Sequence, residues 1–122
     1  MRVLDASAVI AWVFDEEGGN LVEPLFEDGA ISAVNYAEVL QRLIRRGEPI
    51  EECVKSVDRC GLRVIDAGPD AAIIAAELRK HDNLSLADRF CIALGALAAA
   101  PVVTADRYWA TLPLPAQVEL IR

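Results

Sequence analysis

Four acidic residues have types and spacings that could do chemistry: Asp5, Glu38, Asp88 and Asp106. If the chain brings them together, their negative charges raise one another's pKa values unless a cation occupies the centre. Oxygen ligands without His or Cys select Mg²⁺ or Mn²⁺ over zinc. Such a metal site activates water and stabilises the charge of an in-line phosphoryl displacement. The four acids are therefore candidate metal ligands and catalytic residues.

Each acid also has a structural explanation when it is taken alone. Asp5 and Asp106 are of the residue type that caps helices and turns. Ser85 and Asp88 have the spacing of a capping box, in which the third helical residue reaches back to the cap amide. Asp88 otherwise lies among apolar neighbours, where an unpaired carboxylate is costly to desolvate. Both interpretations of these acids stay open at the level of sequence.

Arginines near the acids have two interpretations as well. Glu38 and Arg42 have the i,i+4 spacing of a helical ion pair. Arg89 and Arg107 directly follow two of the candidate ligands. Because Arg forms forked hydrogen bonds with phosphate and with carboxylate alike, these two arginines are candidate substrate contacts or members of surface ion pairs.

The periodicity of apolar residues predicts the elements that position these side chains. Short strands are expected at residues 3–4, 29–32, 62–65 and 102–104, and a last apolar segment, 118–121, closes the chain. Helices are expected over residues 6–14, 21–26, 34–46, 50–60, 71–80 and 85–99. Short apolar strands separated by helices favour parallel pairing and a three-layer α/β/α sandwich. The chain has no internal repeat or linker, so we expect a single domain over residues 1–122.

The fold class predicts where the acids lie. Ligands of open parallel sheets bind beyond the carboxyl ends of the strands, near the point where the strand order reverses. Asp5 and Asp106 each follow a predicted strand, so both are aimed at the same edge if the two strands are neighbours. Asp88 lies in the first turn of a helix, and Glu38 lies one turn into another.

Composition narrows the class of protein. The 122 residues include 12 Lys and Arg against 19 Asp and Glu, a net charge of −7, and 54 % are hydrophobic. Such an apolar chain folds around a core, yet its longest apolar stretch is too short to cross a membrane. The chain has three cysteines without a CxxC pair and an acid where a signal peptide is apolar, so we expect a cytoplasmic protein.

The acidic balance argues against nucleic-acid binding by bulk positive charge. A nucleic-acid enzyme stays open if cations or local arginines neutralise the contact. The only histidine is His81, which excludes a two-histidine ribonuclease and an HExxH metalloprotease. The chain contains no GxxxxGK[ST], GxGxxG or GxSxG motif. This excludes proteins with the standard nucleotide-binding loops and hydrolases with a nucleophile elbow.

Four segments, taken together, carry a family resemblance: residues 3–8, 35–39, 84–89 and 103–107. In their order and spacing they closely resemble the PIN-domain ribonucleases, and specifically the VapC-type toxins of toxin–antitoxin pairs. The resemblance covers essentially the whole chain. The chain differs from some PIN domains at Tyr108 and Trp109, since those domains carry a further acid there, so the number of bound metal ions stays open.

The resemblance implies a five-stranded parallel sheet with an acidic pocket that binds Mg²⁺ or Mn²⁺ through Asp5, Glu38, Asp88 and Asp106. It places Ser7 and Thr104 among the hydroxyl groups that support these ligands. The implied reaction is endonucleolytic cleavage of phosphodiester bonds in structured RNA, tRNA or rRNA. The implied partners are a neutralising antitoxin and a second copy of the chain, in a homodimer or a toxin–antitoxin hetero-oligomer.

Three other functions are considered. A PIN-type nuclease for RNA processing would have no antitoxin. A non-catalytic metal-binding interaction domain would hold the ion without cleaving RNA. A phosphoacceptor receiver domain is also an α/β protein with clustered acids, but it requires paired acids after the first strand and a Lys after a late strand. Asp5 stands alone and Arg107 takes the place of any Lys, so the receiver domain is disfavoured.

Overall fold

A parallel sheet of five strands runs through the molecule. The computed structural model describes all 122 residues. The strands are β1 (Arg2–Leu4), β2 (Gly29–Ser32), β3 (Arg63–Ile65), β4 (Val102–Thr104) and β5 (Val118–Leu120). Every neighbouring pair is parallel, and the strand order is β3-β2-β1-β4-β5. The predicted α/β class with a five-stranded parallel sheet is confirmed.

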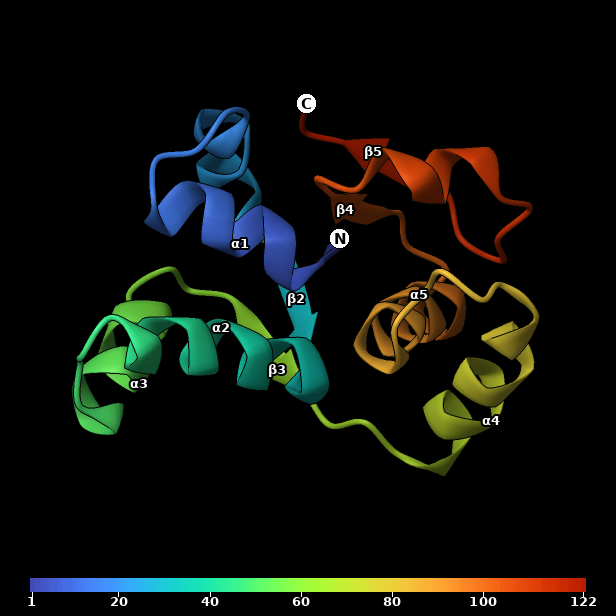
Figure 1. The fold of residues 1–122 in the computed structure, drawn as a ribbon, viewed down its shortest axis with the longest axis horizontal. Coiled ribbons are helices and arrows are strands. Elements are labelled where there is room, and N and C mark those ends of the chain that lie inside the picture. The colour runs from blue at the N-terminus through green and yellow to red at the C-terminus, as the bar shows by residue number, and fades with distance from the viewer.

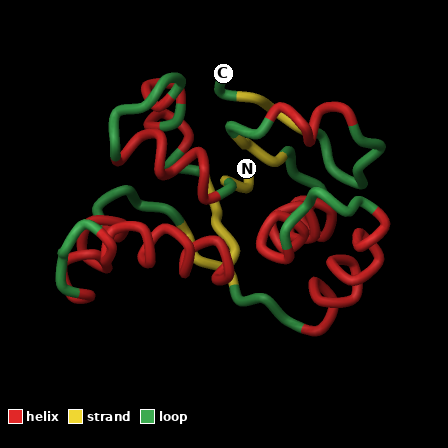
Figure 2. The backbone as a smooth tube through the Cα atoms, in the orientation of Figure 1, coloured by secondary structure: helices red, strands yellow, loops and turns green.

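Five α-helices connect the strands (Figures 1 and 2). They are α1 (Ala6–Val13), α2 (Ala33–Arg45), α3 (Ile50–Asp58), α4 (Pro69–Glu77) and α5 (Leu86–Ala98). Short 3₁₀ turns complete the connections: η1 (Gly19–Leu21), η2 (Glu23–Leu25), η3 (Leu78–Lys80) and η4 (Arg107–Thr111). None of the helices is long and apolar enough to span a membrane.

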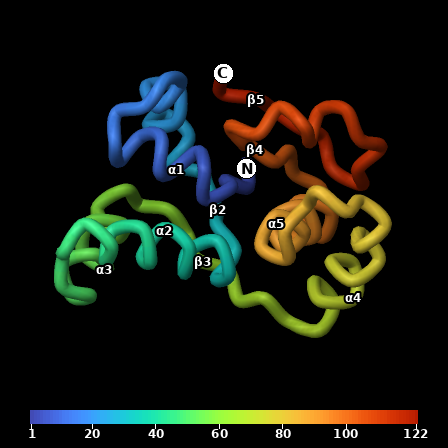
Figure 3. The backbone as a smooth tube through the Cα atoms, viewed as in Figure 1, coloured from blue at the N-terminus to red at the C-terminus, as the bar shows by residue number.

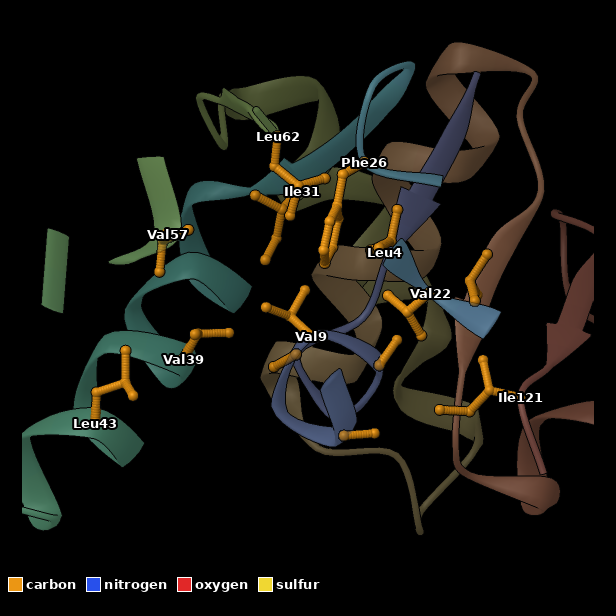
Figure 4. Packing of buried hydrophobic residues seen from close by; sticks show 14 of the residues in the cluster. Leu4, Val9, Val22, Phe26, Ile31, Val39, Leu43, Val57, Leu62 and Ile121 are labelled. Atoms are coloured by element: carbon orange, nitrogen blue, oxygen red, sulfur yellow. The ribbon is translucent and has the colours of Figure 1, made fainter. Parts of the chain in front are cut away.

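Two hydrophobic clusters define the layers of the sandwich, because successive strand residues point to opposite faces of a sheet. Leu4 packs in the larger cluster with residues of α1, α2 and α3, as Figure 4 shows for Val9, Val39 and Val57. Val3, the preceding residue, packs in the second cluster with residues of α5 and with Trp109 of η4. Helices therefore cover both faces of the sheet, as the three-layer prediction requires.

The strand order reverses between β1 and β4. The chain adds β2 and β3 on one side of β1 and then returns to place β4 and β5 on the other side. In Figure 3 the blue N-terminal strand lies beside orange β4, although the two are about a hundred residues apart in the sequence. Asp5 N–H donates to the carbonyl of Val103 over 2.8 Å, so the end of β1 is fixed to the end of β4.

One predicted helix is absent from the structure, and one observed turn lies outside the predicted elements. The helix expected over residues 21–26 is absent, and η1 and η2 stand there instead. Pro24 explains part of this difference, since proline lacks the N–H that would continue a helical ladder. The turn η4 was not anticipated from the apolar pattern, because Asp106 starts it through a side-chain hydrogen bond rather than through periodicity.

Candidate active site

The four acids lie around one pocket at the carboxyl edge of the sheet. Asp5, Glu38, Asp88 and Asp106 line a cavity of about 400 Å³, together with six further residues. Asp5 follows β1, Glu38 lies on α2, Asp88 lies in the first turn of α5 and Asp106 follows β4. The pocket therefore lies at the point where the strand order reverses, which is where open parallel sheets bind ligands.

Asp5 stands at the N-cap position of α1, but its side chain makes no capping hydrogen bond. Its Oδ2 instead accepts hydrogen bonds from Ser7 Oγ at 2.6 Å and from Thr104 Oγ1 at 3.0 Å. The carboxylate is only 4 % exposed. The Asp5 carboxylate therefore lines the pocket and does not cap the helix, so helix capping does not explain why an acid stands at this position.

Ser7 and Thr104 both accept hydrogen bonds from the backbone that follows β4, in addition to binding Asp5. The N–H of Ala105 donates to Ser7 Oγ at 3.0 Å, and the N–H of Asp106 donates to Thr104 Oγ1 at 3.1 Å. The two hydroxyl oxygens lie 3.2 Å apart. The ends of β1 and β4 are thus joined through side chains, and Asp5 and Asp106 are held on the same edge.

Asn35 is a central residue of the site to which sequence reasoning gave no role. It lies in the first turn of α2 and is fully buried. Its Nδ2 donates at 3.1 Å to Glu38 Oε2 and at 3.1 Å to the carbonyl of Ala87, and it makes a longer contact of 3.5 Å with Asp5 Oδ1. One amide therefore connects three of the segments that carry the acids. The only sequence signal was its spacing, three residues before Glu38.

Asp88 and Asp106 do have the capping roles that their sequence context suggests. Asp88 Oδ2 accepts from the N–H of Ser85 at 2.9 Å, and Ser85 Oγ accepts from the N–H of Asp88, so the capping box is present. Asp106 Oδ1 accepts from the N–H of Tyr108 at 3.0 Å. In each carboxylate the second oxygen has no hydrogen bond within the chain, so capping leaves one oxygen available to the pocket.

Burial and mutual repulsion destabilise the charged forms of Asp5, Glu38 and Asp88. Burial, aided by the charge of Asp88, raises the pKa of Asp5 to about 7 in spite of the lowering effect of the Ser7 hydrogen bond. The pKa of Glu38 is raised by burial and by Asp88, and that of Asp88 by burial and by Asp106. The pocket thus concentrates negative charge that a bound cation would stabilise.

None of the four carboxylates is in a salt bridge. The ion pair expected between Glu38 and Arg42 is wrong, because the Arg42 guanidinium stacks over the ring of Phe14 with its carbon 5.1 Å from the ring centroid. Arg122 also lines the pocket, but it is bound to Glu16 at 3.5 Å. The acids consequently have no protein cation of their own.

Arg89 and Arg107 do not line the pocket. Arg89 Nη2 donates to the carbonyl of His81 at 3.3 Å, and Arg107 Nε donates to the carbonyl of Arg122 at 3.1 Å. Sequence adjacency to a candidate ligand did not bring either guanidinium into the cavity wall. Arg42 and Arg122, which come from other elements, line it instead.

The donor set fits a hydrated divalent cation. No three His, Cys, Asp or Glu side chains are grouped closely enough to hold an ion by themselves. Mg²⁺ does not need such a cage, since it keeps several of its waters and takes only one or two direct carboxylate ligands. A buried, unpaired Asp5 beside two further acids with raised pKa values is the environment that such an ion would neutralise.

Comparison with known families gives the class of the protein. The chain belongs to the PIN domain family, whose model matches residues 2–113. PIN domains are as a family nucleases, and they generally use divalent metals. No curated protein matches the chain by sequence.

Solved structures share the fold at low sequence identity. A chain in DNA-bound VapBC from Salmonella typhimurium matches with a TM-score of 0.75 and 21 % identity, over 99 % of this chain and 98 % of that one. A toxin–antitoxin complex from Klebsiella pneumoniae matches with a TM-score of 0.75 and 20 % identity, over 96 % and 99 %. VapBC2 from Rickettsia felis, bound to a promoter DNA fragment, gives 0.72 and 19 %, over 98 % and 97 %.

Proposed function

We propose that this PIN domain is a Mg²⁺- or Mn²⁺-dependent endoribonuclease of the VapC type. In this proposal Asp5, Glu38, Asp88 and Asp106 are the metal ligands and catalytic residues. The observation that carries it is the convergence of these four unpaired carboxylates on one pocket where the strand order reverses. The substrate is a phosphodiester bond of structured RNA, tRNA or rRNA.

The residues around the pocket would have different roles in the reaction. A bound divalent ion would supply an activated water and neutralise charge on the phosphoryl oxygens. Ser7 and Thr104 favour the charged form of Asp5 by donating to Oδ2, and so oppose the effect of its burial. Asn35 orients Glu38, and the N–H of Ser85 orients Asp88. Arg89 and Arg107, which lie outside the pocket lining, are candidates for contacts with phosphate groups of the substrate.

The proposal includes an antitoxin partner and a second copy of the chain. Its support is the likeness to chains from VapBC and other toxin–antitoxin complexes, which extends over nearly the full length of both chains. A toxin that has a neutralising antitoxin is expected to arrest growth when it is expressed without that antitoxin. Relief of that arrest by the product of a small neighbouring gene would support the toxin assignment, whereas harmless expression would favour an RNA-processing nuclease without an antitoxin.

The catalytic assignment is tested by conservative substitution. Asp5→Asn and Asp88→Asn preserve side-chain size and remove the negative charge, so each variant should lose Mn²⁺-dependent cleavage of RNA while keeping the fold. Asp82→Asn removes one charge from the exposed loop before α5 and is the matched control, which should cleave like the unsubstituted chain. Full activity in either pocket variant would overturn the site. Metal binding without any cleavage would favour a non-catalytic interaction domain.

A further inference from the structure

Four exposed arginines near the pocket have no acidic partner. Arg42, Arg45 and Arg46 lie at the end of α2, and Arg59 follows α3. None of their side chains forms a salt bridge or takes part in the side-chain hydrogen bonds of the chain. In a protein with a net charge of −7, such a local excess of unpaired cations needs an explanation. We refer to these four residues as the arginine strip.

An aromatic ring holds two of the guanidinium groups in place. The ring of Phe14, at the end of α1, has the Arg42 guanidinium carbon 5.1 Å and the Arg46 carbon 4.7 Å from its centroid. A cation over an aromatic face is stabilised by the ring quadrupole. This contact uses no hydrogen-bond acceptor, so the two side chains are held near the ring and keep their N–H donors for a ligand.

The strip continues directly from the acidic pocket. A hollow of about 170 Å³ beside the pocket shares Glu38 and Arg42 with it and is also lined by Arg45. Further along the same helices, Arg46 and Arg59 line a cavity of about 510 Å³. Arg42 and Arg46 are four residues apart, which is a rise of about 6 Å along the axis of α2. A chain of anionic groups could therefore follow the strip from the pocket.

The helix dipole explains only part of this arrangement. Cations at the carboxyl end of α2 are favourable, because the last carbonyls carry partial negative charge. Arg59 belongs to a different helix, however, and stacking on Phe14 holds Arg42 and Arg46 over a side chain rather than at those carbonyls. Glu48 is the one acid that lines the larger cavity with Arg46 and Arg59, and it makes no salt bridge with either.

We propose that the arginine strip binds the phosphate backbone of the RNA strand that enters the acidic pocket. The inference rests on the proposed function and adds to it the surface that the substrate follows. Arg is suited to this role, because it forms forked hydrogen bonds with phosphate oxygens and stays charged. Contacts of this kind position the strand without reading its sequence. They also resolve the conflict between an acidic protein and a polyanionic substrate.

The test compares two double variants with the same change of charge. Arg45→Gln/Arg46→Gln removes two charges from the strip, and Arg79→Gln/Lys80→Gln removes two exposed charges from η3. Binding of a labelled hairpin RNA of about 20 nucleotides is measured against KCl concentration at constant Mg²⁺. Both doubles carry Asp88→Asn so that the RNA stays intact, and Asp88→Asn alone is the reference.

The strip double should lower the slope of log K against log salt by about 1.4 to 1.8, since each lost phosphate contact removes about 0.7 on the single-stranded loop and about 0.9 on a duplex. The η3 double should keep the reference slope and affinity. Phe14→Leu keeps every charge and should weaken binding with an unchanged slope, because it removes only the orientation of the guanidinium groups. Melting curves of each variant exclude unfolding as the cause.

Reference-like binding by the strip double would overturn the inference, and so would an equal loss in the η3 double, which would indicate bulk charge alone. If no protein in the series binds RNA, the inference is also overturned, and an acidic protein partner becomes the occupant to test. The proposed function is tested separately, by measuring Mn²⁺-dependent RNA cleavage by the unsubstituted chain. Absence of cleavage with strip-dependent binding would refute the nuclease and leave the strip in place.

Discussion

At the scale of single residues, Asp5 is the acid most strongly constrained by the fold. It is 4 % exposed, receives two hydroxyl hydrogen bonds and lies beside two further carboxylates. Its charge is therefore unfavourable in the folded protein until a cation is bound. The neighbouring Asn35 amide adds a donor that reaches Glu38 and the start of α5. Ser7 and Thr104 therefore act on the charge of Asp5, whereas Asn35 orients Glu38 and the start of α5.

The raised pKa of Asp5 predicts a pH-dependent stability in the metal-free protein. The pKa is 3.8 in an ordinary environment and about 7 in the fold. Between these values the folded state binds more protons than the unfolded state, so the stabilisation by protonated Asp5 is present at low pH and is lost as pH rises through 7. Asp5→Asn lacks this proton and should exceed the parent in stability above pH 7, by up to about 4 kcal/mol.

Urea unfolding with EDTA, at a pH near 5 and again near 8, measures this difference. The gain in free energy of unfolding from Asp5→Asn should be larger at the higher pH. Asp82→Asn is the control and should show no such change, because its side chain lies in an exposed loop. An equal effect of Asp5→Asn at both pH values would contradict the raised pKa.

Asn35→Ala should weaken metal binding without changing the charge of the pocket. The substitution removes the hydrogen bonds that Asn35 donates to Glu38 and to the carbonyl of Ala87, so we expect a loss of about 1–3 kcal/mol in stability. Supporting residues of metal ligands typically contribute about 10–100-fold in affinity. Calorimetric titration with Mn²⁺ measures the change, with Asn83→Ala in an exposed loop as control. Unchanged Mn²⁺ affinity would show that the amide has only a structural role.

Asp88 could be selected from the sequence because a carboxylate among apolar neighbours is unusual and costly, and the other three acids because of their positions relative to the predicted strands and helices and the family resemblance. Asn35 could not be selected in this way. An amide at the start of a helix is common, and its importance arises from three acceptors that come from residues 5, 38 and 87. Such a role depends on tertiary contacts, which one sequence alone does not contain.

At the scale of elements, α5 shows how a helix places a ligand. The capping box of Ser85 and Asp88 fixes where the helix starts, and the same carboxylate faces the pocket. Gly95, in the middle of α5, fixes how closely the helix packs on the sheet. A Cβ at this position would meet a side-chain methyl of Val102 on β4 and lie 3.1 Å from the carbonyl of Ala100.

Gly95→Ala should therefore destabilise the protein even though alanine favours helices. The gain in helix propensity is about 1 kcal/mol, whereas overpacking a buried contact costs typically about 1–3 kcal/mol or more when backbone is involved. Thermal unfolding should show a lower Tm for Gly95→Ala. Gly68→Ala is the matched control, since a Cβ there meets nothing within 4 Å. A Tm of Gly95→Ala at or above that of the parent would mean that α5 can move away from the sheet.

The predicted strands and the longer helices agree with the structure because their apolar periodicity is strong. The predicted helix 34–46, for example, is observed at Ala33–Arg45, with Gly47 in the left-handed region at φ +93° just beyond it. The segment 21–26 has enough apolar residues for a helix, but its proline and short length yield 3₁₀ turns. Local capping produced η4, and periodicity contains no signal for it.

At the scale of the whole molecule, the distribution of charge matters more than its sum. Five of the 19 acids line one pocket, the four candidate ligands and Glu16, and four of the 12 cations form the strip beside it. The net charge of −7 excludes binding of RNA by general attraction, but it does not describe this surface. A metal ion in the pocket would add positive charge where the strip ends.

Metal binding should consequently stabilise the fold. A ligand that binds only the folded state adds about 2.7 kcal/mol at a concentration of 100 times its Kd. We expect Mn²⁺ to raise Tm at a pH near 8, EDTA to reverse the rise, and the effect to shrink near pH 5, where the carboxylates bind protons instead. Asp5→Asn and Asp88→Asn should show a smaller rise. A rise of equal size in both variants would place the ion elsewhere on the protein.

The central position of β1 has a consequence for synthesis on the ribosome. Asp5 is made first, yet its hydroxyl partner Thr104 and the fourth acid, Asp106, are made about a hundred residues later. Strands that pair over such separations form late, because a long loop must close before the contact is gained. A partly synthesised chain therefore contains Asp5, Glu38 and Asp88 without the strand that joins them. If the pocket is a nuclease site, it becomes complete only once the residues up to Asp106 have left the ribosome.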